Sequence, residues 1–320
     1  MATGDIVLAG GTGFLGQALA EHLRSAGRRV VVLSRRAGGE TEGVKQVRWD
    51  AGNVGDWARE LDGAAAVVNL AGRSVNCRYS ARNRAEILNS RVNATRAIGA
   101  AVARCARPPA VWLNASSATI YRDARDRAMD EAAGDPGEGF SVEVCQAWER
   151  AFFEAPAPRT RKVAMRLSIV FGPAPGGVFG IFQRIVRLGL GGRQGDGGQF
   201  VSWLHVTDFC RAVEWLLAHD EISGPVNLCA PVPLPNAEFM RAWREACGVK
   251  VGLPATAWML RIGAFFLRTE TELLLKSRRV VPRRLQDSGF HFQFGAWRPA
   301  VADLTATAER HGLPEIKSGR

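Results

Sequence analysis

Short apolar runs alternate with longer amphipathic segments along the first half of the chain. The apolar runs have the length of buried β-strands, and they fall at residues 5–10, 29–34, 64–72, 109–116 and 162–172. Apolar residues with helical spacing lie between them, at 14–27, 81–104 and 141–154. Strands that alternate with helices indicate a parallel sheet covered by helices on both faces. The predicted fold class is therefore α/β, with a doubly wound parallel sheet of the Rossmann type in residues 1–172.

This alternation breaks down beyond residue 172. Glycine-rich loops interrupt the chain there, and helical spacing returns at about 236–247 and 255–276. The simplest organisation is a second, smaller lobe that is built mainly from the C-terminal half and binds the substrate. The predicted segments are a substrate lobe at 173–203 and 231–296, a return to the first domain at 204–230, and a C-terminal helix and tail at 297–320.

Composition narrows the class of protein further. The chain has 320 residues, of which 47% are hydrophobic, enough for a substantial core. Its six cysteines show neither C-x-x-C pairing nor metal-ligand spacing, and the N-terminal segment lacks the features of a signal peptide. Charged residues interrupt the longest apolar region, at 253–275, which argues against a membrane span. We therefore predict a soluble, cytoplasmic protein without a bound metal or a membrane partner.

The net charge of +11 raises the question of a nucleic-acid partner. Only five of the 42 basic residues are lysines, which is more typical of a GC-rich coding bias than of a phosphate-binding face. The basic residues are also dispersed, apart from KSRRVVPRR at 276–284. A solvated basic surface is the simpler interpretation, and nucleic-acid binding is not expected.

A glycine-rich turn joins the first predicted strand to the first predicted helix. Residues 10–16 read GGTGFLG, which places Gly10, Gly13 and Gly16 three residues apart. In a Rossmann turn the first glycine permits the tight turn, the second lets the backbone approach a pyrophosphate, and the third packs the helix on the sheet. The helix N-terminus adds free N–H groups and a positive dipole end. At the first junction of an alternating pattern, this triplet predicts a dinucleotide-binding site.

The end of the second predicted strand indicates which dinucleotide is preferred. An NAD site usually has Asp or Glu about 20 residues after the glycines, where it bonds the ribose 2′-hydroxyl. This chain has Ser34, Arg35 and Arg36 there, and no acidic residue before Glu40. A guanidinium can pair with a 2′-phosphate through two charge-assisted hydrogen bonds, whereas a carboxylate would repel it. We therefore predict NADP(H), with Arg35 as the main contact, Arg36 as the alternate and Ser34 as an added hydroxyl.

Further motifs carry a resemblance to a known family. In order and spacing, GGTGFLG, NLAG at 69–72, SSATIY at 116–121, RLSIVFGP at 166–173 and WLHVTD at 203–208 resemble the extended short-chain dehydrogenase/reductases. More narrowly, CQAWE at 145–149, LGLGGRQGDG at 188–197 and SRRVVPRRLQDSGFHF at 277–292 are similar to the atypical group called epimerase family proteins. The resemblance covers nearly the whole chain. It implies a Rossmann domain that binds NADP(H) and a small C-terminal substrate lobe.

The resemblance also implies cofactor contacts at individual positions. Asn93 matches a helix asparagine that supports the active site in many relatives. Asp50 would approach the adenine, although a surface turn is an equally simple interpretation. Besides the three glycines and residues 34–36, the predicted cofactor-binding residues are Thr12, Phe14, Leu15, Asp50, Leu70, Ala71, Gly72, Asn93, Ser168, Ile169 and Val170.

The helix that should carry the family's catalytic pair departs from the pattern. The family has Tyr-x-x-x-Lys, in which the lysine lowers the pKa of the tyrosine and holds the ribose. Aligning CQAWE with the family's Lys-x-x-x-Glu puts Ser141 at the tyrosine and Cys145 at the lysine. A serine hydroxyl is a poor acid–base group near neutral pH, and a neutral thiol, with a reference pKa of about 8.5, supplies no positive charge. The usual acid–base pair is absent.

Other residues remain as catalytic candidates. Ser117 matches the family's catalytic serine and would hydrogen-bond a substrate oxygen. Tyr121 follows the same strand and could reach the site from another direction, and Cys145 is either a proton donor or a packing residue beside the ribose. For Glu143 and His205, an exposed glutamate and a structural histidine are the simpler interpretations.

Two functions fit these features. The first is an NADP(H)-dependent oxidoreductase or epimerase with atypical chemistry, acting on a small carbonyl or sugar derivative. The second is a catalytically weak or inactive regulatory protein whose response to NADP(H) alters its contacts with a protein partner. The retained Ser117 favours the enzyme, and the missing Tyr–Lys pair favours the regulator. The sequence gives no feature that specifies the substrate.

Overall fold

The computed structural model of the chain describes residues 4–36, 38–41, 43–174, 177–256, 258–259 and 275–310. The helix expected at 255–276 falls almost entirely outside the described residues, and so does the tail after residue 310.

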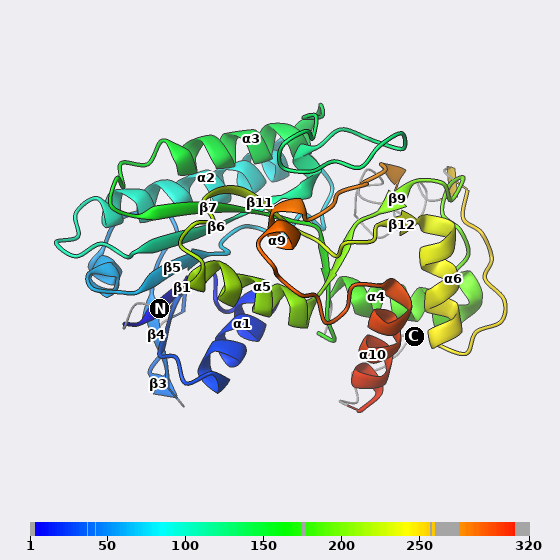
Figure 1. The fold of residues 1–320 in the computed structure, drawn as a ribbon, viewed down its shortest axis with the longest axis horizontal. Coiled ribbons are helices and arrows are strands. Elements are labelled where there is room, and N and C mark those ends of the chain that lie inside the picture. The colour runs from blue at the N-terminus through cyan, green and yellow to red at the C-terminus, as the bar shows by residue number, and fades with distance from the viewer. Residues whose placement is uncertain are drawn as a thin grey trace.

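A single eight-stranded sheet forms the centre of the first domain (Figure 1). Its strand order is β11-β7-β6-β5-β1-β2-β4-β3, and every neighbouring pair is parallel except β3 with β4. The strands are β1 (Ile6–Ala9), β2 (Val30–Ser34), β3 (Glu40–Thr41), β4 (Val44–Arg48), β5 (Ala66–Asn69), β6 (Val111–Ser117), β7 (Arg161–Leu167) and β11 (Gly224–Leu228). This confirms the predicted doubly wound parallel sheet.

The chain reverses its direction of travel across the sheet next to β1. Val7 of β1 pairs with Val31 of β2 on one side and with Val67 of β5 on the other. All four residues of β1 are buried, as expected for a strand that is covered on both faces. In open α/β sheets the ligand crevice lies beyond the carboxyl ends of the strands at such a point. The candidate site is therefore expected where β1 and β5 end.

Helices cover both faces of the sheet (Figure 1). On one face, α1 (Phe14–Ser25) packs beside α5 (Val206–Ala218). On the other face, α2 (Ala81–Val102) packs beside α3 (Phe140–Phe153). Short 3-10 turns, η1 (Asp56–Leu61) and η2 (Ala118–Ile120), follow β4 and β6.

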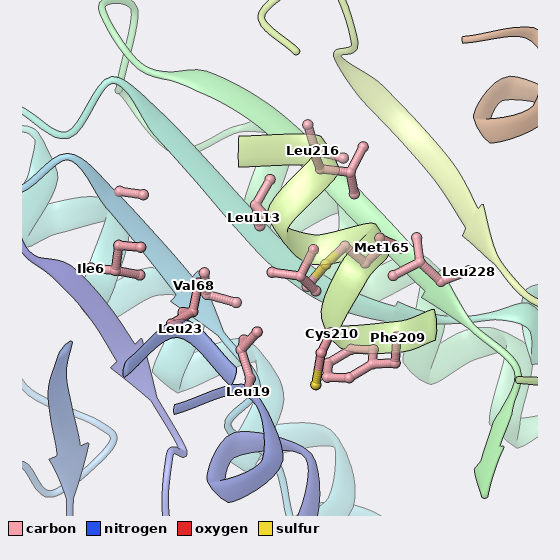
Figure 2. Close-up of a cluster of buried hydrophobic side chains, with 14 of the residues drawn as sticks. Ile6, Leu19, Leu23, Val68, Leu113, Met165, Phe209, Cys210, Leu216 and Leu228 are labelled. Atoms are coloured by element: carbon pink, nitrogen blue, oxygen red, sulfur yellow. The ribbon is translucent and has the colours of Figure 1, made fainter. Parts of the chain in front are cut away.

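Each face has its own apolar core. Under α1 and α5, Leu19, Leu23 and Phe209 meet the inward side chains of the sheet, such as Leu113 (Figure 2). Under α2 and α3, Trp112 of β6 packs edge-on against Phe152, with ring centroids 4.7 Å apart. The two cores fix the helices against the sheet, so that the loops at its carboxyl edge are held by rigid elements.

A second lobe lies beyond the carboxyl end of the sheet (Figure 1). Its core is a cluster of aromatic side chains that includes Phe171, Trp203, Phe239, Trp243 and Trp297. The elements around it are β8 (Ile169–Phe171), α4 (Val178–Ile185), η3 (Val186–Leu190), β9 (Phe200–Val201), β10 (Trp203–His205), β12 (Leu234–Pro235), α6 (Asn236–Ala246) and α10 (Trp297–Arg310). The core draws on segments that are far apart in the sequence.

Several elements were not anticipated by the alternating pattern. β4 has the sequence VKQVR and is only half-buried, and β11 begins with glycine and proline, so neither forms an apolar run. Both strands nevertheless belong to the sheet, with β11 at one edge and β4 between β2 and the short edge strand β3. The short helix α9 (Arg283–Asp287) packs against β11, and Leu285 joins the core of the first domain.

Candidate active site at the carboxyl edge of the sheet

The glycine-rich turn closes tightly between β1 and α1. Gly10 has a φ of 79°, in the left-handed region that favours glycine, and a Cβ there would lie 2.9 Å from the Ala71 backbone nitrogen. A Cβ at Gly16 would lie 2.5 Å from the Cα of Gly11. These two glycines are therefore required by the packing of the turn itself, as predicted for the first and third positions of the triplet.

Gly13 is different, because its own surroundings do not require a glycine. Its φ is −78°, and a Cβ there would meet only the carbonyl oxygen of Gly10, at an ordinary 3.5 Å. Gly13 is the N-cap of α1, and neither a capping side chain nor an acidic residue occupies the first turn. Thr12 and Gly13 are exposed, and Phe14 and Leu15 are partly exposed. The turn thus presents bare backbone and a helix N-terminus, a surface that suits a phosphate group.

The end of β2 forms the next part of the same edge. Ser34 is buried, and its hydroxyl donates to the Arg36 carbonyl oxygen at 2.6 Å and accepts from Gln46 Nε2 at 2.6 Å. The side chains of Arg35 and Arg36 are exposed, and neither makes an ion pair with a described residue. Ser34 therefore shapes the turn that holds both guanidinium groups. A cavity of about 260 Å³ adjoins this turn, lined in part by Gly11, Thr12, Val32, Gly39 and Gln46.

The Asp50 carboxylate is occupied within its own loop. It accepts hydrogen bonds from the backbone N–H groups of Gly52 and Asn53, both at 2.9 Å, and from the Asn53 side chain at 2.8 Å. These bonds lower the pKa of Asp50, with Asn53 as the main cause. This geometry supports the surface-turn interpretation, and a contact with adenine stays a prediction.

A buried polar cluster supports the loop after β5. Asn69 donates to Asn114 Oδ1 at 2.7 Å and to Thr95 Oγ1 at 3.3 Å, and its own oxygen accepts from the N–H of Ala71 at 3.0 Å. Trp148 Nε1 donates to Thr95 at 2.9 Å, which ties α3 to α2. These buried hydrogen bonds thus hold the Leu70–Gly72 loop, which was expected to line the cofactor groove.

On α2, the predicted residue Asn93 does not point toward the interior, whereas two other side chains do. Asn93 lies on the exposed face of the helix, and no hydrogen bond joins it to a described residue. Thr95 is fully buried, and Arg91 lies beside the loop after β5, where a Cβ at Gly72 would come within 3.2 Å of its Cζ. The role assigned to Asn93 stays a prediction, and Arg91 and Thr95 are the residues that the sequence did not single out.

Ser117 ends β6 and is linked to α3 through a residue that the sequence analysis missed. Its Oγ accepts from the N–H of Thr119 at 3.2 Å and from the Thr119 hydroxyl at 3.0 Å. The Thr119 oxygen lies 3.3 Å from the Sγ of Cys145. Either the thiol or the hydroxyl can donate in this second contact. The hydroxyl hydrogen of Ser117 remains available to another acceptor.

Cys145 holds a neutral thiol at this position. It is buried, and burial raises the pKa of its thiol above the usual value. Ser141, one turn earlier on α3, is partly exposed, and Glu143 is exposed. No ammonium group stands on α3 where the family has its lysine, as the sequence indicated.

Tyr121 is part of a buried chain of hydrogen bonds. Its hydroxyl donates to Asn227 Oδ1 at 2.9 Å and accepts from Arg166 Nη1 at 2.9 Å. Arg166 also donates to both carboxylate oxygens of Glu149, each at 2.8 Å, and Glu149 accepts from Ser116 at 2.7 Å. Burial raises the pKa of Tyr121. This arrangement favours an architectural role for Tyr121, and its part in proton transfer stays a prediction.

The remaining candidates lie where the chain enters and leaves the second lobe. Ser168 donates to the Leu228 carbonyl oxygen at 3.2 Å, while Ile169 and Val170 are partly buried in β8. His205 is buried, caps α5 by accepting from the N–H of Thr207 at 3.1 Å, and stacks on Phe294 with centroids 3.9 Å apart. His205 is therefore held as a structural residue.

Together, these features define a class of protein. A doubly wound parallel sheet, a glycine turn at its switch point and a polar strand end beside it are the features of a dinucleotide-binding fold. The chain belongs to the NAD dependent epimerase/dehydratase family, which it matches over residues 6–229. Residues 255–304 match a domain of unknown function, DUF1731. The atypical extended short-chain dehydrogenase/reductase assignment is confirmed.

Relatives support this assignment along almost the whole chain. An epimerase family protein of Mycobacterium bovis, Mb2239, is 34% identical over 308 residues, which cover 95% of this chain and 99% of the relative. The crystal structure of human epimerase family protein SDR39U1 with NADPH superposes with a TM-score of 0.85 at 29% identity, covering 94% of this chain and 99% of that one. A nucleoside-diphosphate sugar epimerase from Corynebacterium glutamicum has a TM-score of 0.76 at 25% identity, covering 98% of this chain and 63% of that one.

The described part of the chain lacks two further features. None of its helices combines the length and the hydrophobicity that a bilayer span requires. Among the same residues, no group of His, Cys, Asp and Glu side chains has the geometry of a metal site.

Proposed function

We propose that this chain is an NADP(H)-dependent oxidoreductase or epimerase with atypical acid–base chemistry. The observation that carries the proposal is the placement of Ser117, with its hydroxyl hydrogen free, at the same sheet edge as the glycine turn. A dinucleotide on the turn and a substrate at Ser117 would then lie side by side. Reduced cysteine thiols, free at all six positions, agree with a cytoplasmic location.

The residues around the turn fit NADP(H). Gly13 lacks a side chain although the fold does not demand this, which is the condition for close approach of a pyrophosphate. Arg35 and Arg36 leave their guanidinium groups without anionic partners among the described residues, and they follow the strand that should reach the adenosine ribose. The human relative that was crystallised with NADPH supports the same cofactor.

Alanine substitutions at two glycines should separate folding from cofactor binding. Gly16→Ala places a methyl group 2.5 Å from a backbone atom, and overpacking of this kind costs about 1–3 kcal/mol of unfolding free energy. Gly13→Ala meets no such contact and should cost less than about 1 kcal/mol, as at other N-cap positions. We expect Gly13→Ala to weaken NADPH binding although it leaves the fold intact. Thermal unfolding and calorimetric titration of both variants test this, and unchanged NADPH affinity in Gly13→Ala would contradict the pyrophosphate assignment.

Ser117 has the geometry of a donor to the substrate. When bound, NADP(H) supplies or accepts the hydride at the reacting carbon. Thr119 donates to Ser117 and also contacts the Cys145 thiol, so the three side chains form a chain of hydrogen bonds that ends at Ser117. The Ser117 hydroxyl is thereby oriented, and donation into such a chain strengthens its own hydrogen bond to a substrate oxygen. We infer that the substrate is a carbonyl compound or a sugar derivative, a class that includes the sugar-nucleotide of the Corynebacterium relative's name.

Removing this hydroxyl should slow the reaction without loosening the cofactor. For Ser117→Ala we expect kcat to fall by about 10²–10³-fold, the usual cost of removing one donor to a developing oxyanion. The measurement is NADPH oxidation against a panel of carbonyl and sugar-nucleotide substrates, with NADPH affinity measured in parallel. Ser116→Ala is the matched control, because the Ser116 hydroxyl faces Glu149. Equal rates for wild type and Ser117→Ala would exclude Ser117 as the donor.

A second function has its own supporting observation. Ser141 and Cys145 replace the tyrosine and the lysine, and Tyr121 is engaged with Arg166 and Asn227. These features favour a catalytically weak or inactive protein that responds to NADP(H) and changes its contacts with a protein partner. The absence of turnover across the substrate panel, together with a partner whose binding depends on NADPH, would favour this regulatory function over the enzyme.

A further inference from the structure

The guanidinium of Arg91 lies at the meeting point of three parts of the site. Its Nη1 donates to the Arg73 carbonyl oxygen at 3.0 Å, in the loop that follows β5. Its Cζ lies 5.1 Å from the ring centroid of Trp148, on the same face of α3 as Cys145 one turn earlier. A Cβ at Gly72 would come within 3.2 Å of the same carbon. Arg91 therefore reaches from α2 into the space between the cofactor loop and α3.

This cation lacks an anionic partner in the described part of the chain. Its hydrogen bonds there come from Nη1 alone, to the carbonyl oxygens of Arg73 and Ile87. Burial lowers the pKa of Arg91, while the nearby side chains of Cys145 and Tyr79 act in the opposite direction. A partly buried guanidinium without a carboxylate is costly unless other groups satisfy it. The face of Trp148 supplies part of that compensation through a cation–π contact.

We propose that Arg91 replaces the missing lysine as the cation that holds the nicotinamide-side ribose of NADP(H). The lysine would stand at Cys145, which is buried beside the same face of α3 that Arg91 covers. The Nε and Nη2 groups of Arg91 are the donors available for ribose hydroxyl groups. This inference rests on the proposed function, because it requires that the cofactor runs from the glycine turn along the Leu70–Gly72 loop.

The nicotinamide-side ribose and the adenosine end of the cofactor would lie at different strands of the sheet. The adenosine end lies at β2, where Arg35 follows the strand, whereas Arg91 lies on the other side of the switch point, beside the loop after β5. A truncated ligand that contains only the adenosine half therefore probes Arg35 without probing Arg91. Adenosine 2′,5′-bisphosphate is such a ligand, because it carries the 2′-phosphate and lacks the nicotinamide ribose.

The experiment is calorimetric titration of Arg91→Met with NADPH and with adenosine 2′,5′-bisphosphate. Methionine keeps an apolar side chain against Trp148 and removes the charged donors. We expect the Kd for NADPH to rise about tenfold or more, which is the usual cost of losing hydrogen bonds from a charged group. The Kd for the bisphosphate should change by less than about twofold, as for substitutions that do not touch a ligand. Arg91→Lys should recover part of the NADPH affinity.

Two control variants separate the charge from other effects. Arg96→Met removes an arginine from the exposed face of the same helix, and Ser90→Ala removes the hydroxyl that accepts from the N–H of Arg73 at 3.0 Å. Both should bind NADPH as the wild type does. Equal weakening of both ligands in Arg91→Met, or weakening of neither, would overturn the inference, as would the same loss in Ser90→Ala. Wild-type protein that binds neither ligand would overturn the proposed function itself.

Discussion

Replacing Arg35 with glutamate is expected to weaken NADPH binding by about 100-fold or more, because two charge-assisted hydrogen bonds are lost and a repulsive carboxylate takes their place. Arg35 is exposed and follows the buried Ser34, which fixes the turn through Arg36 and Gln46. The substitution therefore changes the charge without disturbing the strand. Binding of NADH, which lacks the 2′-phosphate, should change by less than about threefold, since only general electrostatics remain.

Titration of both dinucleotides at the same ionic strength provides the measurement. Arg96→Glu makes the same change of charge on the exposed face of α2 and should leave the preference for NADPH intact. Arg36→Glu tests the alternate contact and should have the smaller effect of the two neighbouring variants. If the wild type binds NADH as tightly as NADPH, or if Arg35→Glu loses both equally, the 2′-phosphate assignment is wrong.

Removing Arg166 should produce the largest loss of stability. Its guanidinium makes two hydrogen bonds of 2.8 Å to Glu149 and one of 2.9 Å to Tyr121, and both carboxylate and guanidinium are largely buried. Arg166→Met would leave the Glu149 carboxylate buried with Ser116 as its remaining partner. Breaking one side of a buried ion pair typically costs about 3–5 kcal/mol of unfolding free energy. Urea unfolding of the variant measures this loss.

A second substitution separates the effect of the ion pair on stability from the effect of side-chain volume. Adding Glu149→Gln to Arg166→Met removes the uncompensated charge, so the double variant should be more stable than Arg166→Met alone. Arg82→Met removes an arginine that is 89% exposed and paired with Glu86, and it should cost less than about 1 kcal/mol. A loss in Arg166→Met as small as that in Arg82→Met would show that the buried chain contributes little to stability.

The fold could be predicted where apolar residues form a clear run or a regular spacing along the sequence. The apolar runs that form β1, β2, β5 and β6 are buried on both faces of the sheet. The glycine turn directly follows the first of these runs and precedes the first helix. Such an apolar run is missing from β4, which reads VKQVR and is half-buried, and from β11, which starts with glycine and proline. Those strands are fixed by pairing with neighbours, which the local sequence does not encode.

The candidate site divides in the same way. Ser117 and Cys145 could be found because each occupies a position in a recognisable motif. Thr119 joins them only once β6, η2 and α3 are packed together, and this contact spans 26 residues. The sequence did not show which side of α2 faces the site either, because a long helix with a weak apolar stripe gives no clear orientation. The exposed Asn93 follows Arg91 by only two positions in the sequence.

The aromatic core of the second lobe has a consequence for how this chain can have evolved. Trp297 lies in the region that matches DUF1731, yet it stacks on Phe239 at 4.2 Å and contacts Trp203, which belongs to the region that matches the epimerase family. Trp203 and Trp297 thus bury each other's rings across the two matched regions, together with Phe239, which lies between these regions in the sequence. The two matched regions therefore share one aromatic core, and exchanging one of them alone would remove the Trp203–Trp297 contact from that core.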